Sequence, residues 1–376
     1  MRYLLFSLSV FVFYAIFYFS LSNGAHELVH RSVESGKLPG LNEPLRTHYT
    51  GVESIDHLLA VLTIFFYPTL DGSSATLFLH GIGFSGTFGA AWTLVVLESW
   101  RKGNAGTVAA YPAIFGLVAQ VMTFAFATPL FCGLQLGCSI TARHPHADNI
   151  RVPRAVLVAL PLIFVVGFML PTHLMALPAS MSSVDLKQVA IAIWQPWPAY
   201  VSILATVAYF VLSPFFPNNN RASLSSLRWV YAFAFANATV THLVSWIVSL
   251  ATVIAPALFN ARFLDALHPC RVFEVPLPWS GLKVDTVADG VHVFLRWDYL
   301  IGSAGILLWA LSLYTTAHKQ ILSTVSWTGL AVKVALLTIV SGPAGAAVEL
   351  IWERDELVIR ETSGSRQQVT KNKKSS

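Results

Sequence analysis

The sequence predicts an all-α fold, a polytopic transmembrane helical bundle of about eight or nine helices, and three observations support this. Hydrophobic residues make up 55% of the 376 residues and charged residues only 11%, whereas soluble domains carry about 25% charged residues. Apolar stretches of about 20 residues, long enough to cross a bilayer, recur along the chain. The basic residues behind the net charge of +5 lie in short loops and in the C-terminal tail, so no nucleic-acid partner is expected.

Nine apolar segments are predicted to cross the membrane, with proline, glycine and charged residues between them. They are residues 3–21, 55–70, 77–98, 107–131, 152–172, 194–216, 229–255, 291–314 and 325–348. Arg2 precedes the first segment and no A-x-A cleavage site follows it, so we expect residues 1–22 to stay as a membrane anchor. Residues 23–350 then form the multi-helix domain, and residues 351–376 form a polar, basic tail.

The loop charges predict how the chain lies in its membrane. Nine crossings place the two termini on opposite sides, and the side of the C-terminus carries more lysine and arginine, which makes it cytosolic. The chain ends Lys373-Lys374-Ser375-Ser376, the spacing of a cytosolic di-lysine address for the endoplasmic reticulum. We therefore expect an endoplasmic reticulum protein, with a lumenal N-terminus and membrane lipid as its surroundings.

Ionisable groups inside the predicted spans are few, and such groups are costly in a bilayer and usually functional. With the predicted topology, Asp56, Glu98, Gln195 and Asp298 lie at similar depth in the cytosolic half. Span ends are wetter than span centres, which would explain Asp56 and Gln195 without a function. Asp298 lies about two turns into its span, where that explanation fails.

The span that contains Asp298 places small and aromatic residues on the same helix face. Gly302, Gly305 and Trp309 share that face, and Phe294 lies one turn before the aspartate. The pattern either outlines a cavity below a carboxyl group or lets a neighbouring helix approach closely at the glycines.

Two further polar groups have competing interpretations. Glu98 and Arg101 are close enough in sequence to pair on one helix face, so Glu98 is either a catalytic carboxyl or half of an ion pair. His242 lies in a polar and aromatic stripe with Trp246. A histidine in this position either packs through hydrogen bonds or takes part in the chemistry.

One short motif suggests a different function. His26-Glu27-Leu28-Val29-His30 matches H-E-x-x-H, which binds zinc when both histidines share a helix face. No third ligand is evident, and Ser35-Gly36 and Pro39-Gly40 break the chain soon afterwards. A membrane metalloprotease is therefore a minor alternative, and we expect neither a metal nor a cofactor.

Several stretches resemble a family of fungal membrane-bound terpene cyclases, of the type found in ascochlorin and ascofuranone pathways. They are Tyr49-Thr50-Gly51-Val52, Ile55-Asp56, Phe65-Phe66-Tyr67-Pro68, Leu70-Asp71-Gly72, Ala91-Trp92, Glu98-Ser99-Trp100-Arg101-Lys102-Gly103-Asn104, Phe294-Leu295-Arg296-Trp297-Asp298-Tyr299-Leu300-Ile301-Gly302-Ser303 and Leu308-Trp309-Ala310-Leu311. The chain is more distantly similar to smaller cyclases of the pyripyropene and paxilline pathways. By that resemblance, the glutamate and aspartate acids of those cyclases correspond to Glu98 and Asp298.

The resemblance implies an isomerase or lyase of fungal secondary metabolism. It would cyclise a polyprenyl chain, often an epoxidised farnesyl unit attached to an aromatic or polyketide core, as in meroterpenoids. Protonating an epoxide or an alkene needs an acid that stays neutral near pH 7, which apolar burial favours. Asp298 and Glu98 are the first candidates for this role, and Asp56 and His242 are further catalytic candidates. A second carboxylate or His242 could accept the final proton.

Aromatic faces stabilise cations, and these faces together with nearby polar groups predict a substrate-binding set. The set is Trp92, Arg101, Gln195, Trp246, Phe294, Trp297 and Trp309. The chain has no Asp-Asp pair, so magnesium-dependent ionisation of a diphosphate is not expected. A lipophilic substrate can enter from the bilayer, and other enzymes of the same pathway are further partners to consider. The rival class is a non-enzymatic carrier or receptor that binds a lipophilic ligand in the same pocket.

Overall fold

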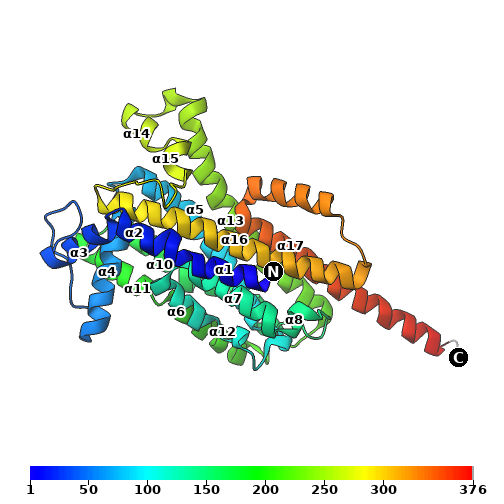
Figure 1. The fold of residues 1–376 in the computed structure, drawn as a ribbon. Helices are drawn as coiled ribbons and strands as arrows, with labels where there is room; N and C mark the ends of the chain where they lie inside the picture. The colour runs from blue at the N-terminus through cyan, green and yellow to red at the C-terminus, as the bar shows by residue number, and fades with distance from the viewer. Residues whose placement is uncertain (375–376) are drawn as a thin grey trace.

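The computed structural model describes residues 1–374, without the side chains of residues 220–221 and 362–374. The predicted di-lysine address therefore lies outside the described residues at Ser375 and Ser376, and the side chains of its lysines are not described either. The described chain is helical, apart from turns, loops and an isolated bridge between Lys37 and Pro44 (Figure 1). This confirms the predicted all-α class.

Six helical segments of the described chain are long and apolar enough to cross a bilayer, and a bent pair of helices makes a seventh. The six are α1–α2 (Arg2–Ser22, with a π-helical turn at Phe13–Tyr18), α5 (Ala75–Ser99), α9–α10 (Arg154–Met175, with a π-helical turn at Val165–Met169), α13 (Asn220–Ile254), α16 (Val287–Leu322) and α17 (Trp327–Lys374). The bent pair is α11 (Val184–Trp194) and α12 (Trp197–Leu212), which meet at 56°. The shorter helices are α3 (Ala25–Ser35), α4 (Glu53–Leu70), α6 (Pro112–Met122), α7 (Phe124–Cys138), α8 (Ile140–Arg143), α14 (Ala261–Ala266) and α15 (Pro269–Phe273).

One predicted span, residues 107–131, is a helical hairpin that turns back inside the bundle. Helices α6 and α7 meet at Thr123, whose φ of 115° lies outside the helical region. The rings of Phe115 and Phe131 are 5.3 Å apart, whereas a straight helix would separate these positions by about 24 Å. The two helices are therefore antiparallel. Such a break is tolerated at membrane depth only where protein groups satisfy the backbone.

The last apolar segment also turns back. Gly342 has a φ of 69° and ψ of 171° inside α17, and Lys333 pairs with Glu353 at 2.5 Å. A straight helix would place those two residues about 30 Å apart. Figure 1 shows this segment entering beside α16 and returning toward the C-terminus. α17 is therefore long and apolar enough to cross a bilayer, but it turns back at Gly342 instead of running straight.

Residues near both chain ends lie at the same end of the bundle, whereas the prediction placed the two termini on opposite sides of the membrane. Arg2 lies against Gly137 near the C-terminal end of α7, and Arg354 of α17 donates to the Thr141 carbonyl in α8. Both hairpins enter and leave at this end, so neither adds a crossing. α1 packs against α7 and α16, and Arg354 and Asp355, which the sequence prediction places in the tail, are fully buried.

Candidate active site

A cavity of about 830 Å³ lies among α3, α4, α5, α6, α10, α13 and α16. Its wall is mainly aromatic and aliphatic. The aromatic members are Phe17, Phe65, Phe66, Phe78, Phe84, Phe88, Phe124, Phe168, Trp194 and Phe294. The volume falls within the range of about 300–1,000 Å³ that is typical of small-molecule sites, and such a wall suits a lipophilic ligand.

Asp298 is the one carboxyl group among the described residues that line this cavity. It is only 5% exposed, and its Oδ1 accepts a hydrogen bond from the Ala125 backbone N–H at 2.5 Å. The Thr123 hydroxyl accepts from the Phe126 N–H in the same turn. Asp298 therefore lies at the N-terminus of α7, where backbone N–H groups and the helix dipole stabilise negative charge. This arrangement can release a proton into the cavity and stabilise the carboxylate that remains.

Aromatic rings from four helices, α4, α5, α7 and α16, line the cavity together with Asp298. The Phe88 and Phe124 ring centroids are 4.8 Å apart, and those of Phe84 and Phe124 are 5.9 Å apart. Phe294, one turn before Asp298, contacts the Phe65 ring at 4.9 Å. These rings present faces and edges that can stabilise a carbocation. Of the predicted substrate-binding set, Phe294 lines the cavity.

The glycines that follow Asp298 do not outline the cavity. A Cβ at Gly302 would lie 2.2 Å from the Phe124 ring, and a Cβ at Gly305 would lie 2.6 Å from Pro129. The second interpretation of this helix face is therefore the correct one, because α7 packs directly on α16 at both glycines.

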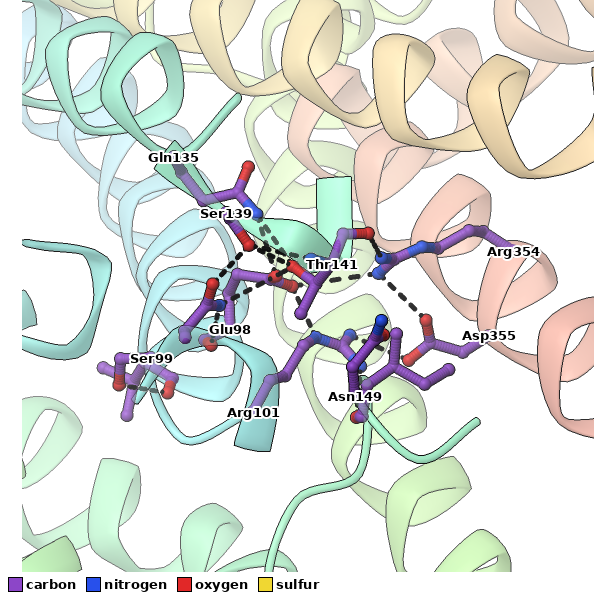
Figure 2. A network of polar contacts seen from close by, with 12 residues as sticks. Glu98, Ser99, Arg101, Gln135, Ser139, Thr141, Asn149, Arg354 and Asp355 are labelled. Carbon is purple, nitrogen blue, oxygen red and sulfur yellow. Dashed lines mark hydrogen bonds and ion pairs between the residues drawn. The ribbon is translucent and has the colours of Figure 1, made fainter. Parts of the chain in front are cut away.

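Glu98 belongs to a different region, a buried network at the end of α5 (Figure 2). Its carboxylate accepts hydrogen bonds from Arg101 Nε, from the Thr141 hydroxyl at 2.5 Å and from Gln135 Nε2 at 2.9 Å. It also pairs with Arg354 at 3.8 Å. Both arginines contact Asp355 in turn, at 2.8 Å from Arg101 and 3.1 Å from Arg354. The network balances two arginines against two carboxylates and connects α5, α7, α8 and α17.

The two carboxyl groups that were predicted at similar depth lie at opposite ends of α7. Asp298 contacts Ala125 in the first turn of this helix, whereas Glu98 contacts Gln135 near its last turn. α7 has 15 residues, which is about 22 Å. The prediction of a shared depth is therefore wrong. Its cause is the assumption that residues 107–131 cross the membrane, which reversed the direction assigned to later helices.

Asp56 and Gln195 do not line the cavity. Asp56 lies in the first turn of α4. It accepts hydrogen bonds from the Thr50 N–H at 2.7 Å, the Thr50 hydroxyl at 2.8 Å and the Gly51 N–H at 3.1 Å. These bonds, the one from the Thr50 backbone first, hold the pKa of Asp56 below its ordinary value. Gln195 lies at the bend between α11 and α12, where its amide donates to the Ile191 carbonyl at 3.3 Å.

His242 lies against the turn of the second hairpin. Its Nε2 is 3.1 Å from the Ile339 carbonyl, and a Cβ at position 342 would lie 3.0 Å from its Nδ1. The histidine thereby satisfies a backbone group at the break in α17. It does not line the cavity.

The four predicted tryptophans lie outside the cavity wall. Trp92 is fully buried against Phe88 and Trp197, and Trp246 stacks on Phe273 at 4.1 Å. The other two donate hydrogen bonds of 2.9 Å, Trp297 to the Pro276 carbonyl and Trp309 to Gln135. Arg101 is part of the Glu98 network, as described above.

The H-E-x-x-H stretch lies on α3. Glu27 pairs with Arg31, and His30 lies 3.4 Å from Glu34. His26 lines the cavity. Within the described residues, no group of three histidine, cysteine, aspartate or glutamate side chains is placed to hold a metal ion.

The sequence interpretation missed most of the cavity wall. Phe84, Phe88 and Phe124 read as ordinary membrane residues, because nothing in an apolar stretch distinguishes a wall from a packing interface. Gln120 and Asn237 also line the cavity. Both are polar residues inside predicted spans, and a search for polar as well as ionisable residues there would have found them.

Comparison with known proteins identifies relatives over most of the chain. A family model described as the CtvD domain matches residues 1–359. Terpene cyclase ctvD from Aspergillus terreus is 34% identical over 364 residues, which cover 94% of this chain and 98% of that protein. Terpene cyclase ascI from Acremonium egyptiacum is 30% identical over 86% of this chain and 83% of that protein. Terpene cyclase penA from Penicillium crustosum is 29% identical, with 90% and 91% covered. No solved structure matches the chain.

The helical bundle and its cavity define a class, an integral membrane protein whose largely apolar cavity suits a lipophilic ligand and has Asp298 as its one carboxyl group among the described lining residues. The chain belongs to the CtvD family of terpene cyclases, which confirms the resemblance found in the sequence. It is accordingly an enzyme, a terpene cyclase.

Proposed function

We propose that this cyclase binds a polyprenyl substrate in the cavity and closes it into rings through carbocations, with Asp298 as the acid that starts the reaction. The substrate we infer is a farnesyl-type chain on an aromatic or polyketide core, a meroterpenoid precursor of secondary metabolism. The observation that supports this assignment is the placement of Asp298, a buried carboxyl group on an otherwise largely aromatic and aliphatic wall. Other enzymes of such a pathway would supply the substrate and take the product.

The reaction is an isomerisation when its atoms are balanced. The Asp298 proton passes to an epoxide oxygen, whose C–O bond then breaks, or to an alkene carbon, whose π electrons form the new C–H bond. The resulting cation is attacked by a neighbouring double bond, and the Phe84, Phe88 and Phe124 rings stabilise the positive charge. Loss of a proton from carbon ends the series, one proton returns to the Asp298 carboxylate, and the ring product has the same mass as the substrate.

Entry from the bilayer is supported by apolar residues that line the cavity and are also exposed. Leu21 is 60% exposed, Val121 55% and Phe78 41%. Val121 lies beside the turn of the first hairpin, inside the bundle's apolar zone. We therefore propose a lateral opening through which a lipophilic chain reaches Asp298 without crossing water.

We propose that the end of the bundle that holds both chain termini faces the cytosol. This end carries the basic tail together with Arg101, Lys102, Arg143 and Arg151, and basic residues mark cytosolic ends. A cytosolic tail would keep Lys373-Lys374 readable as an endoplasmic reticulum address. Replacing both lysines with serine should then let a tagged protein leave that compartment.

The test of function is cyclisation by the purified full-length protein in lipid nanodiscs. A terminally epoxidised farnesyl phenol should be converted to ring isomers of unchanged mass, resolved by chromatography and identified by NMR. Treatment with a chelator should leave the rate unchanged, and Glu27→Gln should remain active. Binding of the probe without isomer formation would favour the carrier class instead, and loss of activity in both the chelator and the Glu27→Gln experiments would revive a metal site.

A further inference from the structure

The cavity wall contains an amide group that has no protein partner. Gln120 lies on α6, one turn before Thr123, and its side chain lines the cavity. Its Oε1 is buried and has no hydrogen-bond partner among the side chains and backbone that the structure describes. An amide left in this state in apolar surroundings is costly, so its presence calls for a ligand that completes it.

The other arm of the same hairpin carries a glutamine in the opposite state. Gln135 on α7 donates from Nε2 to Glu98 at 2.9 Å and to Thr141 at 3.1 Å. Its Oε1 accepts from Trp309 Nε1 at 2.9 Å. Gln135 is fully buried, and protein groups satisfy both ends of its amide. Gln120 Oε1 has no such partner, and Gln120 lines the cavity instead.

The position of Gln120 relates it to Asp298. The Thr123 N–H donates to the Ala119 carbonyl at 3.0 Å and closes the last turn of α6, so Gln120 lies about 4.5 Å along the helix axis before the hairpin turn. Asp298 accepts from Ala125, two residues beyond that turn. Both residues therefore lie beside the same hairpin turn, and both line the cavity.

We propose that Gln120 is a specificity-determining residue, whose amide hydrogen-bonds an oxygen substituent of the prenyl substrate at the end of the cavity where Asp298 lies. The proposal rests on the proposed function for the choice of a prenyl chain, and adds that the chain carries oxygen at this end. The unpaired amide would then favour an oxygenated chain and discriminate against a plain hydrocarbon of equal length, which would leave it unsatisfied.

The probe pair is farnesol and β-farnesene, an alcohol and a hydrocarbon of equal carbon number. Binding to the full-length protein in nanodiscs can be followed by quenching of tryptophan fluorescence, because Trp194 lines the cavity. The affinity of the wild-type protein for farnesol should be about fivefold to tenfold higher than its affinity for β-farnesene, after correction for partition into empty nanodiscs. An alcohol both donates and accepts, so the result does not depend on which amide atom faces the cavity.

Gln120→Met keeps the length of the side chain and removes the amide, so the preference for farnesol should fall to within about twofold. Gln195→Met is the matched control, because it makes the same change at a glutamine that does not line the cavity, and it should keep the wild-type preference. If Gln120→Met does not fold, Gln120→Asn can replace it. This variant shortens the side chain by one methylene group and should also weaken the preference for farnesol. A folded Gln120→Met protein that still prefers farnesol to the wild-type extent would overturn the proposal.

The outcome is separable from that of the proposed function. Asp298→Asn should lose cyclisation and keep the farnesol preference, because Gln120 is unchanged. A preference that disappears in Gln120→Met, in a protein that never cyclises the epoxide probe, would support Gln120 and contradict the acid mechanism. A protein that cyclises the probe, with a preference unaffected by Gln120→Met, would contradict only the role of Gln120.

Discussion

Two buried carboxyl groups, Asp298 and Glu98, lie at the two ends of α7 in opposite surroundings. Asp298 accepts a hydrogen bond from the Ala125 backbone and faces an apolar cavity. Glu98 contacts Arg101 and Arg354, and further donors complete its shell. Both are almost inaccessible to solvent, with exposures of 5% and 0%.

The difference shows that burial alone does not decide the role of a carboxyl group. Two arginines and several neutral donors favour the ionised form of Glu98, and an ionised group surrounded by donors has no proton to give and no open face for a substrate. The Asp298 carboxyl lacks a cationic partner among the groups described around it and has a cavity beside it. Environments that differ in this way are how two carboxyl groups in one protein come to serve different purposes.

The largest effect is expected at the cavity end. Asp298→Asn should lower the cyclisation rate by about 10²–10⁴-fold, because asparagine cannot act as a general acid. Its side-chain oxygen can still accept from the Ala125 N–H, as asparagine does at other helix N-termini, so protein level and thermal stability should stay near wild type. Cyclisation at a near-normal rate in this variant would mean that Asp298 serves only as a cap for α7.

The second effect is expected at the network end, on stability. Glu98→Gln leaves Arg101 and Arg354 with less than their full countercharge, and breaking a buried ion pair costs about 3–5 kcal/mol. Thermal unfolding in detergent should show this loss, while the cyclisation rate per folded molecule stays close to wild type. Arg101→Ala should behave in the same way. A Glu98→Gln protein that is inactive at normal abundance and stability would contradict the contrast between a structural Glu98 and a catalytic Asp298.

The third effect concerns the second hairpin, at His242. Like Glu98, His242 contacts other protein groups and does not line the cavity. Gly342→Ala should lower stability by about 1–3 kcal/mol, because its φ of 69° disfavours a side chain and a Cβ would lie 3.0 Å from His242 Nδ1. Gly329→Ala, on the same helix beside the movable Ser326 side chain, is the control and should be tolerated. An unchanged melting temperature for Gly342→Ala would contradict the turn in α17.

The smallest effect concerns Asp56, a carboxyl group whose partners are backbone and hydroxyl donors. Its pKa is lower in the folded protein than the ordinary value of 3.8. The ionised group therefore adds stability that is fully present well above pH 3.8 and is lost as the pH falls through the folded-state value. Asp56→Asn should lower the melting temperature slightly at pH 7, and the difference should shrink below pH 3.8. A difference that grows on acidification would contradict this assignment, and cyclisation should be unaffected throughout.

The sequence by itself determined the class of fold, because a bilayer core leaves backbone groups no water to bond and so requires long apolar helices. The low charge content and the apolar stretches express that requirement directly, and six of the nine predicted segments are long apolar helices in the structure. The patches around Glu98 and Asp298 also identified the family. The expectation of a function for Asp298 came from the cost of a carboxyl group deep in a span.

Only the tertiary structure decided which apolar stretches cross the bundle and which turn back. An apolar stretch has the same composition in either case, and the outcome depends on whether distant side chains satisfy the backbone at the break. Asp298 and Thr123 do so at the first hairpin, and His242 does so at the second. These contacts join residues more than 90 positions apart in two of the three cases, so no local pattern carries them. They placed Glu98 and Asp298 at opposite ends of α7, and with that separation they set one carboxyl group beside a cavity and the other inside an ion-pair network.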